Sequence, residues 1–145
     1  MGKVPGFMEL ERLEQAHEPV AQRKTHFREF ITPLSQQEAK QQAARCMDCG
    51  TPFCTFSCPL HNVAPEFNDL VYNEDWEKAY HVLSSTNNFP EFTSRVCPAL
   101  CENGCIMNYT QRAMGVKSIE RAIITNAWNQ GWVKPEPPKE HKDKS

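Results

Sequence analysis

Several features that would assign the protein to a common class are missing from its sequence. No apolar run approaches the length of about 20 residues that a membrane-spanning helix needs. Residues 1–7 contain no hydrophobic signal region, and Gly6 stands where a myristoylation motif has Ser or Thr. The net charge is only -2, which leaves no basic footprint for nucleic acid. These absences predict a cytoplasmic protein that binds neither membranes nor nucleic acid.

Strand patterns and nucleotide-binding glycines are also missing. No segment shows the alternation of apolar and polar residues that a half-buried strand needs, and no internal repeat is visible. Glycine occurs six times in 145 residues, and nowhere as the G-x-G-x-x-G fingerprint of a dinucleotide-binding turn. The sequence therefore predicts an all-α chain without a fingerprint site for FAD or NADPH.

Helix signals are present in two places. Ser35 and Glu38 form a capping box ahead of strong helix formers that continue to the first cysteine. Ser118 is placed to cap a last helix, and Gly131 is placed to end it. The apolar face of that last helix is predicted from four positions: Ile119, Ile123, Ala127 and Trp128.

The chain divides into three stretches of different composition. Residues 1–34 are polar and interrupted by proline, which predicts an extended segment that packs on the domain or on a partner. Residues 35–132 contain every cysteine and the helix signals, and they form the predicted domain. Residues 133–145 are charged and rich in proline, which is typical of a linker.

Cysteine is the residue that is present in unusual number, with seven in the chain. An odd number does not close into a disulfide framework, and stable disulfides are rare in the cytosol. The cysteines form two groups: Cys46, Cys49, Cys54 and Cys58, then Cys97, Cys101 and Cys105. Their number and grouping predict metal or cluster binding.

The first group has the spacing of iron–sulfur ligands, C-x2-C-x4-C-x3-C-P. A C-x2-C step lets two thiolates reach one cluster, and in bacterial ferredoxins a closing C-x3-C-P sends its last cysteine to the other cluster. By this analogy Cys46, Cys49 and Cys54 hold three corners of one cubane. Cys58 points away, and Pro59 fixes the direction in which the chain leaves. We therefore expect two 4Fe–4S clusters.

The second group leaves one ligand unassigned. On a helix, Cys101 and Cys105 share a face one turn apart, but a distortion at Gly104 can send Cys105 to a different cluster from Cys101. Two cubanes with four ligands each need one ligand more than the seven cysteines supply. Spacing alone leaves four candidates open for this position: His61, Gln111, Glu102 and Glu120.

Two other uses of the cysteines compete with clusters. One or two structural zinc ions could take four cysteines, or three cysteines and a histidine. Zinc is disfavoured because the chain has one CxxC rather than two separate knuckles. Free cysteine also packs as a small hydrophobic residue, but seven cysteines in two tight groups favour ligation.

Several segments, in order along the chain, resemble the glutamate synthase family. They are GFME at 6–9, RCMDCGTPFC at 45–54, CPLHN at 58–62, NDLVY at 68–72, NNFPEFT at 87–93, VCPALCE at 96–102 and SIER at 118–121. The resemblance is to the N-terminal part of the NADPH-dependent small (beta) subunit and covers residues 2–135. A similar two-cluster domain is found in dihydropyrimidine dehydrogenase and related flavin reductases.

The resemblance implies an all-helical, ferredoxin-like dicluster domain and a ligand set for each cluster. One cluster takes the first three cysteines and the last one, here Cys46, Cys49, Cys54 and Cys105. The other takes three cysteines and a non-cysteine ligand at the start of the following helix, here Cys58, Cys97, Cys101 and Glu120.

The resemblance also implies a role in electron transfer. Electrons from NADPH would pass through FAD and the two clusters to the large (alpha) subunit, which makes glutamate from 2-oxoglutarate and glutamine-derived ammonia. In that family the flavin domains follow this one and open with a Gly-rich fingerprint. FAD and NADPH are therefore expected on downstream domains or on a separately encoded chain, and residues 1–145 are not expected to be an active enzyme alone. The alternatives are a cluster-stapled docking domain of a related flavin oxidoreductase and a zinc-binding interaction module.

Overall fold

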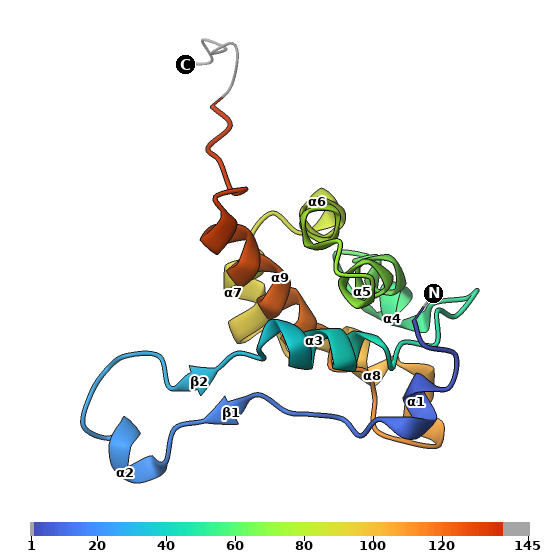
Figure 1. The fold of residues 1–145 in the computed structure, drawn as a ribbon, viewed down its shortest axis with the longest axis horizontal. Helices are drawn as coiled ribbons and strands as arrows, with labels where there is room; N and C mark the ends of the chain where they lie inside the picture. The colour runs from blue at the N-terminus through green and yellow to red at the C-terminus, as the bar shows by residue number, and fades with distance from the viewer. Residues whose placement is uncertain (1, 138–145) are drawn as a thin grey trace.

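The computed structural model describes residues 2–137, and most of its regular structure is helical (Figure 1). In chain order the elements are α1 Gly6–Glu9, β1 Ala16–His17, α2 Val20–Arg23, β2 Ile31–Thr32, α3 Gln36–Ala43, α4 Phe53–Ser57, α5 Ala64–Tyr72, α6 Trp76–Thr86, α7 Pro90–Val96, α8 Leu100–Asn103, the 3-10 turn η1 Ile106–Tyr109 and α9 Val116–Gln130. The prediction of a small, mostly helical fold is confirmed.

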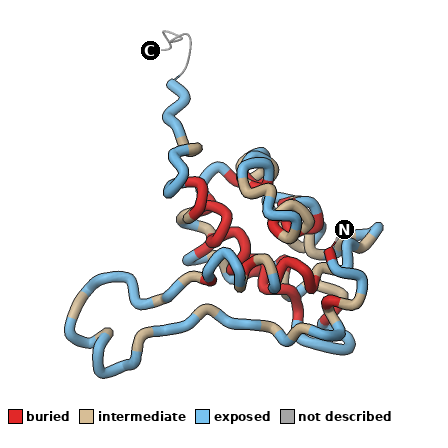
Figure 2. The backbone as a smooth tube through the Cα atoms, in the orientation of Figure 1, coloured by how far each residue is buried: buried red, intermediate tan, exposed pale blue. Residues whose placement is uncertain are grey.

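Helix α9 lies at the centre of the core. It contacts α3, α5, α6, α7 and α8, and buried backbone concentrates along it and its neighbours (Figure 2). Ile119 and Ile123 are fully buried on α9, as are Phe67 on α5 and Leu83 on α6. Helices α7 and α8 thus pack on one central helix, and α4, which carries Cys54, packs on α8.

Two of the predicted helix ends are confirmed. Ser35 is the N-cap of α3, where its Oγ accepts from the Glu38 amide at 3.3 Å and Glu38 Oε2 accepts from the Ser35 amide at 2.8 Å. Gly131 is the C-cap of α9, with φ +72° in the left-handed region that glycine adopts without strain.

Two predictions for the last helix were wrong. The N-cap is Gly115, so Ser118 lies inside the first turn of α9 and not before it. Trp128 is 54% exposed instead of packing in the core. Ile124, one turn earlier on the same side of α9, is buried, whereas residues 128–130 at the end of the helix are all exposed. Trp128 is therefore exposed because the last turn of α9 extends beyond the core.

The prediction of an all-helical chain was also wrong in one detail. β1 and β2 form a small antiparallel sheet, in which Ala16 pairs with Thr32 and His17 pairs with Ile31. Strands of two residues are too short to show an alternating pattern, so they could not be predicted from the sequence. The sheet lies within an arm, residues 16–32, that extends from the helical body with α2 near its far end (Figure 1).

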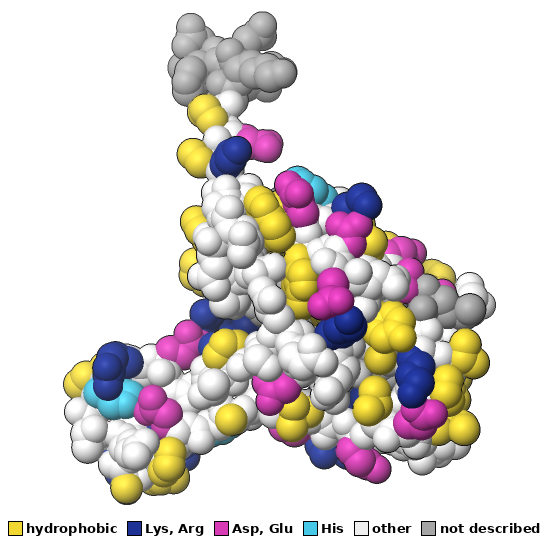
Figure 3. Space-filling model, viewed as in Figure 1, with side chains coloured by type: hydrophobic (Ala, Val, Ile, Leu, Met, Phe, Trp, Pro, Cys, Tyr) yellow, Lys and Arg dark blue, Asp and Glu magenta, His cyan; other side chains and the backbone are white. Residues whose placement is uncertain are grey.

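The arm is anchored where it meets the helical body. Arg121 on α9 is 2% exposed, and its Nη2 donates to Glu29 Oε1 at 2.6 Å and to the Ile31 carbonyl at 3.0 Å. Arg95 on α7 donates to both carboxylate oxygens of Glu29, at 2.9 and 3.0 Å. On the face shown in Figure 3, charges of both signs are interspersed, and several lie on the arm.

The residues before the arm lie along the C-terminal end of α3. The Gln42 side chain accepts from the Leu13 amide at 2.9 Å and donates to the Glu11 carbonyl at 3.0 Å. Gly6 is needed because a Cβ there would overlap the Ala44 carbonyl oxygen. The N-terminal segment therefore packs directly on the helix that leads into the first cysteine.

None of the helices in residues 2–137 is both long and apolar enough to cross a membrane. At the other end of the chain, residues 133–137 have no regular structure. The rest of the predicted linker, residues 138–145, lies outside the described residues.

Candidate functional site

All seven cysteines are free thiols, and they line two separate cavities. The candidate ligands on the first cavity are Cys46, Cys49, Cys54 and Cys105. Those on the second cavity are Cys58, Cys97, Cys101 and Glu120. Each set contains the residues that the family resemblance implies for one cluster. Their role as ligands stays a prediction.

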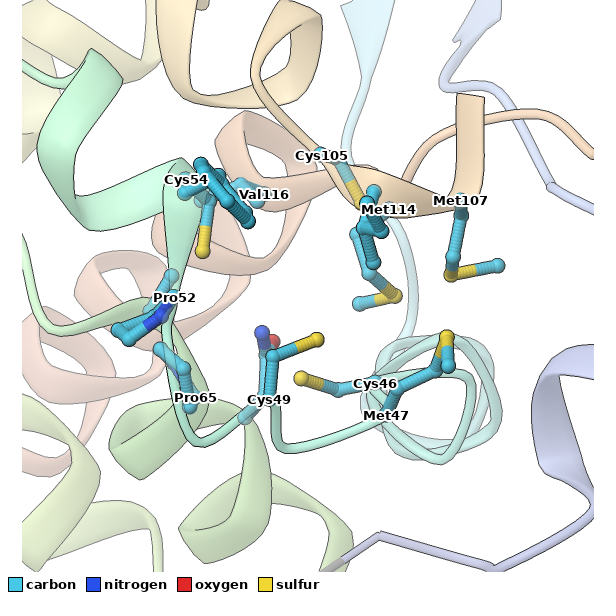
Figure 4. Close-up of a pocket in the computed structure, with 14 residues that line it drawn as sticks. Cys46, Met47, Cys49, Pro52, Cys54, Pro65, Cys105, Met107, Met114 and Val116 are labelled. Carbon is cyan, nitrogen blue, oxygen red and sulfur yellow. The ribbon is translucent and has the colours of Figure 1, made fainter. Parts of the chain in front are cut away.

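The first cavity is assembled from three parts of the chain (Figure 4). Cys46 and Cys49 lie in the loop after α3, Cys54 lies in α4, and Cys105 follows α8. In Figure 4 the sulfur atoms of Cys46, Cys49 and Cys54 point into the shared space. The rest of the lining is mostly apolar: Met47, Pro52, Phe53, Ala64, Pro65, Asn68, Ile106, Met107, Met114 and Val116.

Burial keeps these thiols protonated when no cation is bound. Desolvation raises the pKa of Cys46 to about 11 and also raises the pKa of Cys49 and Cys54. The charges of neighbouring thiolates raise these pKa values further. Since the thiolate is the ligand form, several thiolates in this cavity require positive charge among them, which iron supplies.

A buried arginine lies next to the first cavity. Arg45 is 1% exposed and donates to the carbonyls of Leu10, Arg112 and Ala113, at 2.9, 2.8 and 3.3 Å. Burial lowers its pKa, and the charge of Cys105 acts in the opposite direction. Arg45 therefore places a positive charge near thiolates that would otherwise be uncompensated.

The wall of the first cavity also contains an unpaired amide. Asn68 is 1% exposed, and among the residues that the structure describes neither its Oδ1 nor its Nδ2 has a hydrogen-bond partner of standard geometry. An interaction with this side chain acts to lower the pKa of Cys46. A buried polar group left unpaired costs about 1–3 kcal/mol, so an amide at this position fits a bound group with anionic sulfur.

The backbone beside the first cysteine of each group adopts the left-handed region. Asp48 has φ +49° and Ala99 has φ +57°, each two residues after a cysteine. The Ala99 amide donates to Cys97 Sγ at 3.3 Å, and a backbone hydrogen bond at Asp48 lowers the pKa of Cys46. Hydrogen bonds to sulfur tune cluster potentials. These turns could not be predicted from the sequence, since neither position has the glycine that usually marks a positive φ.

Gly104 brings α8 close to α4. A Cβ at Gly104 would overlap Ser57 Oγ and lie 2.6 Å from Ser57 Cβ and 3.1 Å from the Phe53 carbonyl oxygen. Helix α8 ends at Gly104, and Cys105 continues in extended conformation. Cys101 consequently lines the second cavity while Cys105 lines the first, the separation expected from a distortion at Gly104.

The second cavity lies where several helix ends meet. Cys58 is the C-cap of α4, Cys97 is the C-cap of α7, Cys101 lies in α8, and Glu120 lies near the start of α9. The remaining lining residues are Pro59, Leu60, Asn62, Asn87, Thr93, Ala99, Leu100 and Lys117. Each of the four candidate ligands thus reaches the second cavity from a different helix.

Glu120 is a buried carboxylate among these thiols. It is 5% exposed, and burial raises its pKa to about 7. A hydrogen bond from Asn62 and the charge of Lys117 act in the opposite direction. The pKa of Cys101 is raised strongly, first by burial and then by the charge of Glu120. Three thiols and a carboxylate that line one cavity are a donor set for a metal cluster.

The other candidates for the eighth ligand lie elsewhere. Glu102 accepts from Arg12 Nη2 at 2.6 Å and from the Lys117 amide at 3.0 Å, and it does not line the second cavity. His61 and Gln111 line neither cysteine cavity. Of the four candidates, only Glu120 lies on the wall of the second cavity.

The zinc alternative requires several ligand side chains that converge on one point. Within residues 2–137, no three His, Cys, Asp or Glu side chains are grouped so that they could hold one ion. Structural zinc draws four ligands to within about 2.0–2.3 Å of one point. Cysteines spread around a cavity suit a cluster of several irons better.

Residues 23–132 match the protein family described as dihydropyrimidine dehydrogenase domain II, 4Fe-4S cluster. The chain belongs to this family. The family description and the thiol-lined cavities together support 4Fe–4S binding by the chain.

Relatives of known identity bear the name glutamate synthase. The chain is 48% identical over 138 residues to glutamate synthase (NADH) of Saccharomyces cerevisiae, covering 94% of this chain and 6% of that protein. It is 45% identical over 153 residues to the glutamate synthase (NADPH) small chain of Bacillus subtilis, covering 99% and 31%. It is 47% identical over 121 residues to the small chain of Mycobacterium tuberculosis, covering 83% and 25%. The resemblance found in the cysteine segments is confirmed, and the chain spans less than a third of each of these relatives.

Proposed function

We propose that the chain is an electron-transfer module that holds two 4Fe–4S clusters. The observation that carries the proposal is the sorting of the eight candidate ligands into two separate cavities. In the first, the ligands are Cys46, Cys49, Cys54 and Cys105. In the second, they are Cys58, Cys97, Cys101 and Glu120.

Bound clusters supply one-electron oxidation and reduction. The chain holds the thiolates in place, keeps water away and donates hydrogen bonds such as that from Ala99 to Cys97. Arg45 and Lys117 contribute positive charge near the first and second cavities. These are the means by which a protein sets cluster potentials.

The closeness of the two cavities supports electron transfer over a purely structural role. Cys54 and Cys58 are four residues apart at the two ends of α4, a rise of about 6 Å along a helix. Cys101 and Cys105 form a second short link between the cavities. A cluster that only fixes the fold has no need of a neighbour at this separation.

The similarity to proteins named glutamate synthase supports the proposal that this module works in such an enzyme. We propose that it relays electrons from NADPH and FAD, bound outside this chain, toward the large subunit for glutamate synthesis from 2-oxoglutarate and glutamine-derived ammonia. The proposed partners are that large subunit and the flavin domains, and the proposed location is the cytoplasm. In this proposal residues 35–132 form the cluster domain, 1–34 pack on it or on a partner, and 133–145 link it to a flavin domain.

Redox titration tests the electron-transfer role. The chain is reconstituted anaerobically with iron and sulfide and reduced stepwise while electron paramagnetic resonance (EPR) is recorded. Two reducible clusters are expected. If neither cluster accepts an electron within the range of about -700 to +450 mV that iron–sulfur proteins cover, the electron-transfer role is wrong and the docking alternative is supported.

A further inference from the structure

Asn62 is a buried amide that touches the proposed ligand Glu120. It lies between α4 and α5 and is 4% exposed. Its Nδ2 donates to Glu120 Oε1 at 2.7 Å in a buried hydrogen bond. It also lines the second cavity beside the thiols. The side chain is thus placed to act on the carboxylate from outside the ligand set.

The Asn62 amide is held in one orientation by its neighbours. Thr86 Oγ1, at the end of α6, donates to Asn62 Oδ1 at 2.8 Å. Thr55 Oγ1, on α4 between two of the cysteines, donates to the Asn62 carbonyl at 3.0 Å. Because a hydroxyl occupies Oδ1, the NH2 end of the amide is the one that faces Glu120.

The two oxygens of Glu120 are in different situations. Among the residues that the structure describes, the carboxylate accepts one hydrogen bond, from Asn62 to Oε1. Oε2 is left without a donor from the described chain. Protein carboxylates that bind a metal are themselves hydrogen-bonded, and these outer partners orient the ligand.

We propose that Asn62 is the positioning residue of the second cluster and acts through Glu120. Asn62 holds Oε1, which leaves Oε2 as the oxygen available to iron. The inference rests on the proposed second cluster and on Glu120 as its ligand. Donation from Asn62 withdraws negative charge from the carboxylate, which favours the reduced, more negative cluster. Loss of this hydrogen bond therefore lowers the reduction potential of the second cluster and frees the carboxylate to rotate.

The test uses the full 145-residue chain, reconstituted with iron and sulfide. Two quantities are measured for each cluster: the reduction potential by EPR titration and the rate of iron loss to a chelator. In Asn62→Ala the second cluster is expected to lose iron faster, in line with the roughly 10- to 100-fold effects of outer-shell changes on metal affinity. Its potential becomes more negative, and the first cluster is unchanged.

Two further variants keep the test decisive if Asn62→Ala does not assemble. Thr86→Val keeps the side-chain volume but removes the hydroxyl that orients the amide, so a smaller shift of the same sign is expected. Asn62→Asp keeps the shape but sets a second carboxylate against Glu120, so faster iron loss from the second cluster is expected. Asn73→Ala is the control: this exposed amide donates to the Asp69 carbonyl and to Asp69 Oδ1 on α5 and lines neither cysteine cavity, so both clusters should behave as in the wild type.

The outcomes separate this inference from the proposed function. If the wild type binds two clusters but neither Asn62 variant nor Thr86→Val alters the potential of the second, the positioning role is wrong and the proposed function stands. Equal changes in both clusters, or lower fold stability with an unchanged potential, also overturn it, because they indicate a purely structural role. If the wild type binds only one cluster, the second cluster and the positioning role fail together.

Discussion

Cys54 and Cys58 lie at the two ends of one short helix, yet their thiols line different cavities. Cys54 is the second residue of α4, and Cys58 is its C-cap. A helix this short holds both side chains at a fixed separation. The two candidate clusters are therefore parts of one unit, although each has its own ligands.

This relationship predicts that serine substitutions act on one cluster each. Cys54→Ser should perturb only the cluster of the first cavity, and Cys58→Ser only that of the second, because each thiol reaches one cavity. EPR spectra of the reduced, reconstituted variants measure the effect. If both substitutions change the same signal, the division of ligands is wrong.

Glu120→Ala is predicted to weaken the second cluster selectively. Removing a ligand should accelerate iron loss by at least the roughly tenfold effect of an outer-shell change. The matched control is Glu102→Ala, which removes a nearby carboxylate bonded to Arg12 instead of lining the cavity. Chelator kinetics followed by visible absorbance decide between them. A larger effect from Glu102→Ala, or an equal loss from both clusters, would contradict the assignment of Glu120.

Gly104→Ala is predicted to separate α8 from α4. The added methyl group would overlap Ser57, and overpacking of this kind costs about 1–3 kcal/mol. Urea unfolding of the reconstituted chain should show that loss, together with weaker binding of the cluster held by Cys105. Adding Ser57→Gly removes the side chain that the methyl group meets and should restore most of the stability. No recovery in the double variant would mean that the close approach is not the cause.

Glu29→Gln is predicted to loosen the arm from the helical body. The Arg121 guanidinium is 2% exposed and would lose its carboxylate partner, and hydrogen bonds to charged groups contribute about 1.5–3 kcal/mol. Glu74→Gln is the control, because its ion pair with Lys40 is exposed and worth about 0–1 kcal/mol. Urea unfolding at pH 7 compares the two variants.

The effect of Glu29→Gln should not vary near neutral pH. A hydrogen bond from Arg95, and also the charge of Arg121, hold the pKa of Glu29 below its ordinary value. A carboxylate with a depressed pKa contributes its stability above its unfolded pKa of about 4.3 and loses it only as the pH falls further. The difference between variant and wild type should therefore be constant from about pH 5.5 to 8. A difference that shrinks within this range would mean that the carboxylate is not held as described.

Features set by local chemistry could be predicted from the sequence. The capping box at Ser35 and the left-handed glycine at Gly131 follow from residue type and position alone. The cysteine spacing indicated clusters. Gly104 indicated that Cys105 can reach a different cluster from Cys101. Spacing did not choose among the candidates for the eighth ligand, and the resemblance supplied Glu120.

Features that depend on tertiary packing could not be predicted. Trp128 follows an apolar helix pattern but lies in the last turn of α9, which extends beyond the core. The arm of residues 16–32 is held by Arg121 through Glu29 and Ile31. The residues around Arg121 in the sequence do not indicate that its side chain is buried. Asn62 was part of a motif, but its contact with Glu120, 58 residues along the chain, appears only in the folded structure.

Counting iron and acid-labile sulfide after anaerobic reconstitution tests the central claim most directly. Two cubanes predict about eight irons and eight sulfides per chain. The protein should be brown and free of zinc. Fewer than about six irons per chain, or a colourless protein that contains zinc, would contradict the two-cluster account.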